Sequence, residues 1–369
     1  PKVAQKLRIA LSGGDQGSSF EKLKKEFPDE ASAIGELYDQ YRRCRNDPSE
    51  NARLCLDHVI SGYKIPTYKD DIQPALNRRG LMIRPGRSMA GNGAVKEFIV
   101  TDRKSQVIAN LFTLESSGEG RLDVMTPDGD RPETFSARAR AYEKSHPGTE
   151  VVLQVAGAFS CFGASCPSTN PRQWEPDGFH LNNGKSVGWD KPNSTYGGVV
   201  VVTETGFAIY HRDRIPKDGP SSEEDITIEA VAQKTPAWLN NADLFQAFTL
   251  VEDGKITVAP PSGDKHSSTA RATRRVLVER EFTDAAGRLK RTKMIVQLNI
   301  KMDLYDAARF VADIGAKNAA VLNTGMNALG WMLDSDKHET LLLTPHPGEL
   351  PMPNFTSVLL MVAPSNKPR

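Results

Sequence analysis

The sequence lacks an excess of charge of either sign. Its 47 Lys and Arg residues are balanced by 46 Asp and Glu residues, which leaves a formal net charge of +1. A nearly neutral chain exerts no broad electrostatic attraction on nucleic acid or on acidic membrane surfaces. We therefore expect no nucleic-acid partner.

Long apolar runs are missing as well. The longest fall well short of the roughly 20 residues that a membrane-spanning helix needs, so we predict no membrane span. The chain begins at Pro1 without a secretory signal, and we expect that a leader has been removed or trimmed. With 38% apolar and 25% charged residues among 369, the composition suits one large globular domain with an appendage, or two domains.

The motifs of several large enzyme classes are absent. There is no G-x-S-x-G elbow, no H-E-x-x-H pair, no P-loop and no dinucleotide fingerprint. The glycine-rich stretch at 11–19 lacks the lysine and the preceding strand that a phosphate cradle requires, and it is interpreted as a flexible lead-in. We therefore predict no cofactor and no metal.

Cysteine is scarce, and the four residues form two local pairs, Cys44 with Cys55 and Cys161 with Cys166. An even number in local pairs favours two disulfides and an oxidising compartment. The alternative is four unrelated thiols in a cytosolic protein. A four-sulfur zinc site is less favoured, because neither pair has the close C-x₂-C spacing of zinc ribbons.

Residues 18–63 are predicted to be helical, because apolar side chains recur there at helical spacing. Pro28 divides this segment into two pieces. We interpret 1–65 as a small helical N-terminal module. Residues 66–93, with several prolines and glycines and few apolar clusters, are predicted to be a linker.

From about residue 94 the pattern changes to strands separated by turn signals. The predicted strands are 96–102, 107–114, 120–127, 150–160, 197–211, 244–256, 319–322, 339–346 and 357–364. A β-hairpin is predicted at 274–299 and short helices at 133–148 and 303–314. Mixed strands around a few helices predict an α+β domain with a mixed sheet over 94–369.

Four segments of this domain carry a resemblance to a known family. They are VAGAF (155–159), LFQAFTLVEDGKI (244–256), TARATRRVLV (269–278) and AARFVADIGAKNAAVLNTGMNA (307–328). In order and spacing they resemble the phosphodiester glycosidase family, relatives of the lysosomal enzyme that uncovers mannose 6-phosphate. The matching family motifs are Asn-Gly-Gly-Phe-Phe, a glutamine-containing strand, an Arg-Thr-Ala-Ile-Gly strand and Asn-Leu-Asp-Gly-Gly-Gly-Ser. The resemblance implies the fold of that family and action on a glycan.

The resemblance also implies roles for particular residues. Arg271 takes the place of the family's arginine and would orient an anionic group, and Gln246 matches the glutamine of the second motif. Asn323 and Asn327 would hold sugar hydroxyls. Backbone N–H groups around the two glycines of these motifs would support developing charge; those glycines are Gly157 and Gly325.

Two departures from the family motifs affect the chemistry. Asn323 stands where the family has aspartate, and Ala156 where it has asparagine. An amide does not titrate near neutral pH, so Asn323 cannot replace a catalytic acid. Hydrolysis of a glycosyl bond ordinarily requires two carboxyl groups, or one with assistance from the substrate. A carboxylate from another loop would have to substitute.

The long loop after the first motif supplies candidates for that carboxylate. Asp177 and Glu175 are the nearest carboxylates. His180 is a candidate acid or base at neutral pH, although a structural histidine is the commoner case. Trp174 could stack on a sugar ring or pack locally. In the third motif, Arg274 and Arg275 are alternatives to Arg271 as the ligand of the anionic group. The simpler interpretation is that both are solvent-exposed charges on a strand.

Three functional hypotheses follow. The first is an exported, periplasmic or cell-surface hydrolase whose substrate is a sugar phosphodiester, cell-wall material or exopolysaccharide. The second is a catalytically degenerate module that binds a glycan or a protein, which Ala156 and Asn323 favour. The third is a structural envelope protein that recruits a protein partner through its helical module.

Overall fold

The computed structural model describes residues 21–22, 25, 69–114, 120–125, 134–159, 176–187, 191–204, 206–259, 271–283, 289–322, 330–342 and 358–365. The chain divides into two compact units, Pro1–Gln73 with Ile83–Pro85 and Pro74–Met82 with Gly86–Arg369. Helix α5 (Lys69–Asn77) and strand β1 (Leu81–Pro85) are each divided between these units. Most of the predicted helical module lies outside the described residues, and its fold stays a prediction.

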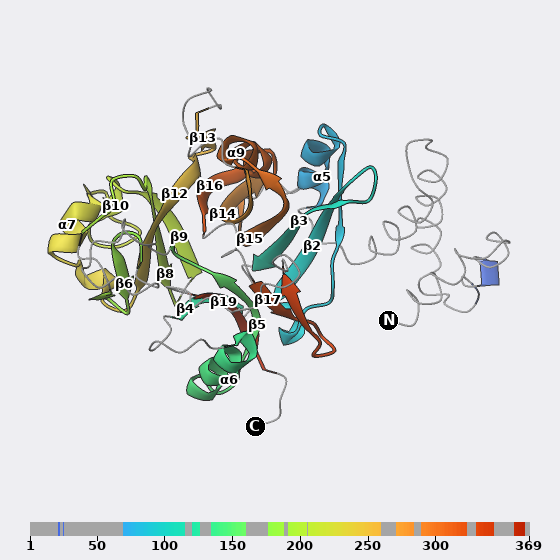
Figure 1. Ribbon diagram of the computed structural model, residues 1–369, viewed down its shortest axis with the longest axis horizontal. Coiled ribbons are helices and arrows are strands. Elements are labelled where there is room, and N and C mark those ends of the chain that lie inside the picture. The colour runs from blue at the N-terminus through green and yellow to red at the C-terminus, as the bar shows by residue number, and fades with distance from the viewer. Residues whose placement is uncertain are drawn as a thin grey trace. The chain divides into compact units, whose positions relative to one another are not determined.

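The second unit contains a large β-sheet (Figure 1). From one edge, its order runs β2-β3-β15-β14-β16-β12, after which β12 also pairs with β6, β8 and β13. Its strands are β2 (Val95–Asp102), β3 (Val107–Leu114), β6 (His180–Asn182), β7 (Lys185–Ser186), β8 (Gly198–Thr203), β9 (Gly206–His211), β12 (Asp243–Glu252), β13 (Lys255–Ile256), β14 (Ala272–Thr283), β15 (Leu289–Met302) and β16 (Ala316–Val321).

A smaller sheet has the order β18-β17-β5-β19-β4. Its strands are β4 (Arg121–Met125), β5 (Thr149–Ala156), β17 (Gly330–Leu333), β18 (Glu339–Leu342) and β19 (Val358–Pro364). A separate two-stranded ribbon joins β10 (Ile215–Pro216) to β11 (Asp225–Ile226). The strand pairings whose register is described are antiparallel in both large and small sheets.

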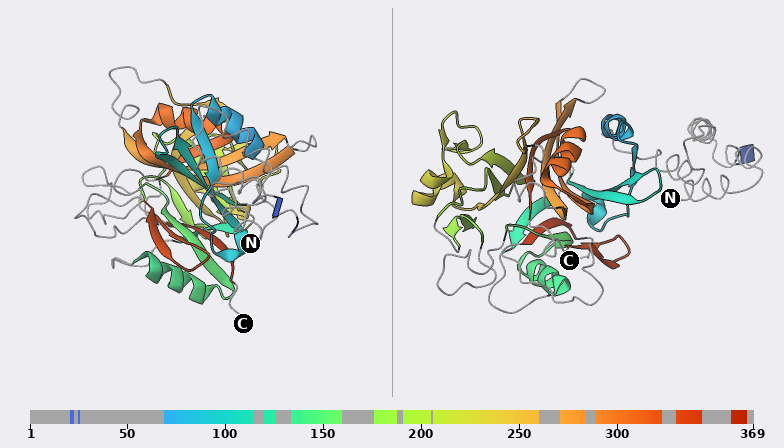
Figure 2. Two further views of the ribbon diagram at one scale, coloured as in Figure 1. Left: turned by 90° about the vertical axis from the view of Figure 1, so that its right-hand side faces the viewer. Right: turned by 45° about the horizontal axis from the view of Figure 1, so that its top comes forward.

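The hydrophobic core lies between the two sheets. Phe112, Phe245 and Leu277 of the large sheet pack in one buried cluster with Leu153 and Met332 of the small sheet. Alternate residues of a strand point to opposite faces, so every second side chain of these strands enters the core. The two layers can be followed in Figure 2. This packing fixes the ends of the strands, which is where the candidate site lies.

Helices cover the outer faces of the sheets. Helix α6 (Phe135–Ser145) buries Phe135 and Tyr142 against the small sheet and lies below it in Figure 1. Helix α9 (Leu304–Asp313) packs against β12, β15 and β16, and the Asp303 side chain accepts a 2.7 Å hydrogen bond from Asp306 N at its first turn. Helix α7 (Ile228–Gln233) covers β6 and β8. Two short 3₁₀ turns are η2 (Gly91–Gly93) and η4 (Ala237–Leu239).

In outline, the prediction of strands with a few helices is confirmed. The hairpin at 274–299 is β14–β15, and the helix at 303–314 is α9 followed by β16. The sheet was predicted to be mixed, whereas the described neighbours are antiparallel. The single strand predicted at 197–211 is a hairpin of β8 and β9, because Gly206 turns the chain with φ 119°. Residues 66–93, predicted as a linker, hold α5, β1 and η2.

Among the described residues, no helix has the length and apolar content needed to cross a membrane. The predicted domain boundaries at 65 and 93 stay predictions.

Candidate functional site

A fully buried arginine stands where β14 meets the end of β16 and the start of β17. Leu322, the residue after β16, donates its N–H to the carbonyl of Arg275 at 2.9 Å. A Cβ atom on Gly330, the first residue of β17, would lie 2.9 Å from Nη2 of Arg275. The absence of a side chain at Gly330 therefore lets the guanidinium pack against this strand. Arg275 thus lies beside both ends of the segment 323–329.

The surroundings of Arg275 hold its guanidinium in place. The residue is 0% exposed, and Nε donates a 2.7 Å hydrogen bond to Oε1 of Gln297, its partner across β14 and β15. Burial lowers the pKa of Arg275 to about 9, which still leaves it cationic at neutral pH. A rigid, weakly hydrated guanidinium suits recognition of a phosphate or a carboxylate.

A second group of residues surrounds the carboxylate of Asp177. Oδ1 accepts a 2.9 Å hydrogen bond from Nδ2 of Asn193, and Oδ2 accepts a 2.7 Å bond from the hydroxyl of Tyr196. Burial and the contact with Asp177 raise the pKa of Tyr196, so this tyrosine stays protonated and donates. The Asp177 backbone N–H donates to the carbonyl of Phe159 at 2.8 Å, which ties the carboxylate to the segment after β5. Asp177 is thereby held in one orientation.

Gln246 on β12 positions the chain around this carboxylate. Its Oε1 accepts hydrogen bonds from the backbone N–H groups of Phe179 (2.9 Å) and Asn193 (2.8 Å). Its Nε2 donates to the carbonyl of Asn193 at 3.0 Å. The side chain is almost completely buried. Gln246 therefore fixes the two segments that carry Asp177 and its partners.

Three aromatic rings lie beside the same carboxylate. Phe159 stacks on Tyr196 with ring centroids 5.5 Å apart, and Phe248 meets both rings edge-on at 5.4 and 4.6 Å. Phe159 and Phe248 are half-buried. Such aromatic surface beside polar groups is suited to the C–H face of a sugar.

The arginine and the carboxylate group are at the same ends of the strands. Gly330, against which Arg275 packs, pairs with Val155 of β5. From Val155 the chain needs four residues to reach Phe159, a span of at most about 14 Å. Gly157 lies buried on that path. Phe248 pairs with the last residue of β16, next to the segment 323–329. We refer to these residues together as the strand-end site: Arg275, Gln297, Asp177, Tyr196, Phe159 and Phe248.

The structure places the other predicted residues in different surroundings. Arg271 is exposed at the start of β14, where Nε and Nη2 donate to the carbonyl of Lys301 at 3.3 and 3.0 Å. Among the described residues, no contact joins Arg271 to the strand-end site.

His180 is 0% exposed on β6 and stacks on Phe245 with ring centroids 6.2 Å apart, and burial lowers its pKa to about 4. It is therefore neutral at pH 7. Ala156 is fully buried at the end of β5.

Several predicted residues lie outside the described part of the chain. They are Asn323, Gly325 and Asn327, the stacking candidate Trp174, and the four cysteines Cys44, Cys55, Cys161 and Cys166. Their proposed roles and the two disulfides stay predictions. The described residues on either side of 323–329, Leu322 and Gly330, lie beside Arg275.

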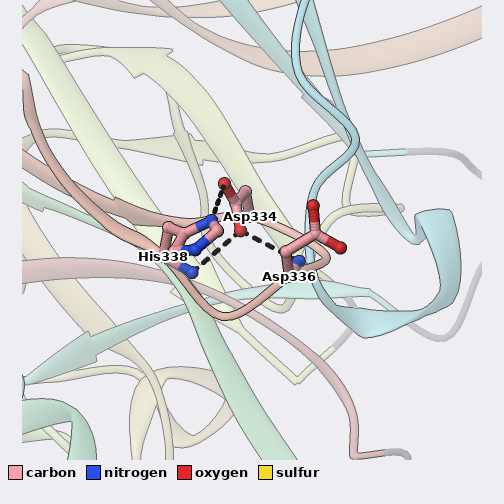
Figure 3. Close-up of side chains that lie close together, drawn as sticks. All are labelled: Asp334, Asp336 and His338. Carbon is pink, nitrogen blue, oxygen red and sulfur yellow. Dashed lines mark hydrogen bonds and ion pairs between the residues drawn. The ribbon is translucent and has the colours of Figure 1, made fainter.

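One acidic cluster has the composition of a metal site but the geometry of a turn. Asp334, Asp336 and His338 lie together in the β17–β18 hairpin (Figure 3). Oδ1 of Asp334 accepts hydrogen bonds from the backbone N–H groups of Asp336 and His338, both at 2.9 Å, and Oδ2 lies 3.4 Å from the imidazole Nδ1. These contacts close the hairpin, and we assign the cluster no metal.

The sequence patterns indicate some residues of this site only weakly and others not at all. Arg275 was weighed below Arg271, although both belong to the third motif. Tyr196 and Asn193 belong to none of the four family motifs, and their roles depend on contacts with Asp177 and Gln246. Phe159 ends the first motif but was given no role. The signal that could have found Phe159 is its place two residues after Gly157, at the end of the first motif.

Comparisons with known proteins give distant structural similarities. The N-acetylglucosamine-1-phosphodiester alpha-N-acetylglucosaminidase catalytic domain from zebrafish, auto-inhibited by its pro-peptide, is 14% identical, with a TM-score of 0.43, over 77% of this chain and 83% of that one. A putative exported protein from Burkholderia pseudomallei is 13% identical, with a TM-score of 0.38, over 72% and 74%.

A hypothetical protein from Synechocystis is 9% identical, with a TM-score of 0.35, and the matched part spans 77% of this chain and 62% of that one. No protein-family profile and no curated protein sequence matches the chain. At these values we draw neither activity nor substrate from the similarities.

Proposed function

We propose that this protein is an exported glycan hydrolase of the phosphodiester glycosidase type, acting at the strand-end site on a sugar linked through an anionic group. The proposal is based on one observation, the buried guanidinium of Arg275. Arg275 lies beside Leu322 and Gly330, the described residues on either side of 323–329. The resemblance of the four sequence motifs supports the substrate class. Arg275 replaces Arg271 as the proposed ligand of the anionic group, because Arg275 is buried and fixed.

The chemistry accounts for a site in which asparagine stands at position 323. When the bond between the anomeric carbon and a phosphodiester oxygen breaks, the leaving group is a phosphate monoester. Its second pKa is about 6, so it departs as an anion without a strong general acid. Arg275 stabilises the charge that develops on the departing oxygen.

The remaining requirement is a group that activates water. Asp177 accepts the proton of the attacking water as its oxygen bonds to the anomeric carbon, while Tyr196 and Asn193 hold the carboxylate. Asn323, Asn327, Gly157 and Gly325 bind the sugar hydroxyls, and Trp174 stacks on the ring. In this proposal His180 supports the fold.

Turnover with matched variants tests the proposal. The protein is incubated with a panel of glycosyl phosphodiesters and purified cell-wall glycans, and released products are detected by mass. We expect Arg275→Lys and Asp177→Asn each to lower kcat/KM by about 100-fold or more. Lysine lacks the planar fork of guanidinium donors, and an amide at position 177 cannot accept the proton of water. Arg271→Ala, four residues earlier on the same strand, serves as the control and keeps near-normal turnover.

Folding of the variants must be checked separately, because Arg275 is buried. Circular dichroism and the melting temperature of Arg275→Lys should match a folded protein before its kinetics are interpreted. Loss of turnover in Arg271→Ala, with Arg275→Lys unaffected, would refute the assignment of the arginine.

A second candidate function is a glycan- or protein-binding module without turnover. Ala156, buried where the family has an asparagine, favours it. Saturable binding to the same panel without release of product would support this candidate instead. The helical module is proposed to recruit an envelope protein, so substitutions within 18–63 should leave turnover unchanged.

Export is proposed from the paired cysteines. Mass spectrometry of the intact protein after alkylation without reductant tests this. Two disulfides leave no alkylated cysteine, whereas four added groups would favour a reducing compartment.

A further inference from the structure

A second polar cleft lies away from the strand-end site. Its volume is about 890 Å³, and it is bounded by the edge strand β4, the end of α6, the β6–β7 turn, the end of β8 and the start of β12. Asp243, which lines it, precedes Phe248 on β12 by five residues, a separation of about 17 Å along the strand. The cleft is therefore distinct from the site that contains Phe248.

The cleft contains a carboxylate, that of Asp243, of which only one oxygen accepts a hydrogen bond from the described residues. Asp243 is 6% exposed, and its Oδ1 accepts a 3.0 Å hydrogen bond from the backbone N–H of Asn183. Among the described residues, Oδ2 of Asp243 accepts no hydrogen bond. Burial, with a smaller contribution from the charge of Asp123, raises the pKa of Asp243 to about 6. Because this carboxylate lines the cleft, its Oδ2 can accept a hydrogen bond from a ligand.

The opposite wall carries a second carboxylate, held by a network. Asp123 on β4 accepts the hydroxyl of Tyr142 at Oδ2 and the backbone N–H of Val124 at Oδ1. Nη2 of Arg121 donates to the same hydroxyl at 3.0 Å and lies 3.7 Å from Oδ2 of Asp123. The guanidinium offsets the charge of Asp123 on this wall.

The rest of the lining offers both donors and acceptors. Nδ2 of Asn183 donates to Oδ1 of Asn182 at 3.0 Å, which leaves an amide N–H₂ on Asn182 and an amide oxygen on Asn183 for other partners. Asn241, which is exposed, adds a third amide. Met125 and Val202 contribute aliphatic surface to the same cleft. Paired donors and acceptors beside aliphatic patches match a saccharide, whose hydroxyls both donate and accept and whose C–H faces are apolar.

We propose that this cleft binds a neutral saccharide chain, with Oδ2 of Asp243 accepting a hydrogen bond from a sugar hydroxyl and the three asparagines completing the contacts. The Nη2 group of Arg121 in this cleft contacts Tyr142 and Asp123, and the proposed recognition is of sugar hydroxyls. The inference does not depend on the strand-end site.

Calorimetric titration of the full chain tests the proposal, with neutral trisaccharides of glucose, of mannose and of N-acetylglucosamine as probes. We expect at least one of them to bind saturably. Asp243→Asn keeps the acceptor for Asn183 N–H but removes the charge, and a charge-assisted hydrogen bond is about twice as strong as a neutral one. Affinity should fall about tenfold in Asp243→Asn and measurably in Asn241→Ala. Asp218→Asn, at an exposed position outside the cleft, is the control and should bind normally.

Three results would overturn the proposal. The first is that none of the trisaccharides binds. The second is binding that Asp243→Asn and Asn241→Ala leave unchanged. The third is binding that Arg275→Lys abolishes while Asp243→Asn retains it, because the saccharide would then occupy the strand-end site. A calcium titration that gives saturable heat, abolished by Asp243→Asn, would also count against a saccharide.

Discussion

The burial of His180 predicts a specific loss of stability in acid. The imidazole is 0% exposed, and neither ring nitrogen has a hydrogen-bond partner among the described residues. Desolvation lowers its pKa from 6.5 to about 4, with no charged neighbour contributing. The folded protein therefore holds His180 neutral, whereas the unfolded chain binds a proton below pH 6.5. Above pH 6.5 His180 is neutral in both states and does not lower the free energy of unfolding. Below pH 6.5 the free energy of unfolding decreases progressively as the pH falls towards 4.

The size of the effect follows from the pKa difference. Each pKa unit corresponds to about 1.4 kcal/mol. At pH 5, where the unfolded chain is almost fully protonated at this position, the free energy of unfolding should be about 2 kcal/mol lower than at pH 7 because of His180 alone. At pH 4 the loss approaches about 3 kcal/mol.

Urea unfolding at pH 7 and pH 5 measures this contribution. His180→Phe removes the titrating group and can stack on Phe245 in its place. The decrease in stability from pH 7 to pH 5 should be about 2 kcal/mol smaller in His180→Phe than in the original protein. His338→Gln is the control, because its side chain is 76% exposed and should change this difference little. Equal pH dependence in the original protein and in His180→Phe would refute the reasoning, as would a measured pKa near 6.5 for His180.

Three further predictions concern single contacts. Tyr196→Phe removes the hydroxyl that donates to Asp177, and the free energy of unfolding in urea should fall by about 1.5–3 kcal/mol because that bond is to a charged group; an unchanged value would show that the bond is not formed. Gly330→Ala places a Cβ 2.9 Å from Nη2 of Arg275 and should cost about 1–3 kcal/mol in the same assay, whereas unaltered stability would mean that the guanidinium is not packed there. Asp303→Ala removes the N-cap of α9 and should cost about 1 kcal/mol by thermal unfolding, while no shift in melting temperature would contradict the cap.

The helices and strands that were predicted correctly are specified by signals from neighbouring residues in the sequence. Helix α9 has a capping aspartate at 303 and an apolar face at helical spacing, and the strand at 319–322 follows at once. These signals lie within a few residues of each other and need no distant partner. The hairpin at 274–299 likewise depends on a turn between two adjacent strands. The break in 197–211 was missed although it has a local signal, because Thr203-Glu204-Thr205-Gly206 is a short polar stretch between two apolar runs.

The candidate site could be predicted only in part. Arg271, Arg274 and Arg275 are close in sequence, and the apolar run Val276-Leu277-Val278 hides the alternation that would show which arginine faces inward. The pairing of β14 with β15 and β16 decides this, and it involves residues more than 20 positions away. The contacts of Asp177 likewise depend on Gln246 on a distant strand. Long-range register, which a single sequence does not reveal, accounts for both omissions.

Direct titration with an anionic glycan is the most informative measurement on the strand-end site. Binding of a glycosyl phosphodiester is compared by calorimetry in the original protein, Arg275→Lys and Arg271→Ala, after each variant has been shown to be folded. We expect affinity at least tenfold weaker in Arg275→Lys and nearly unchanged in Arg271→Ala. Equal affinity in the original protein and in folded Arg275→Lys would contradict the assignment of the buried guanidinium as the ligand of the anionic group.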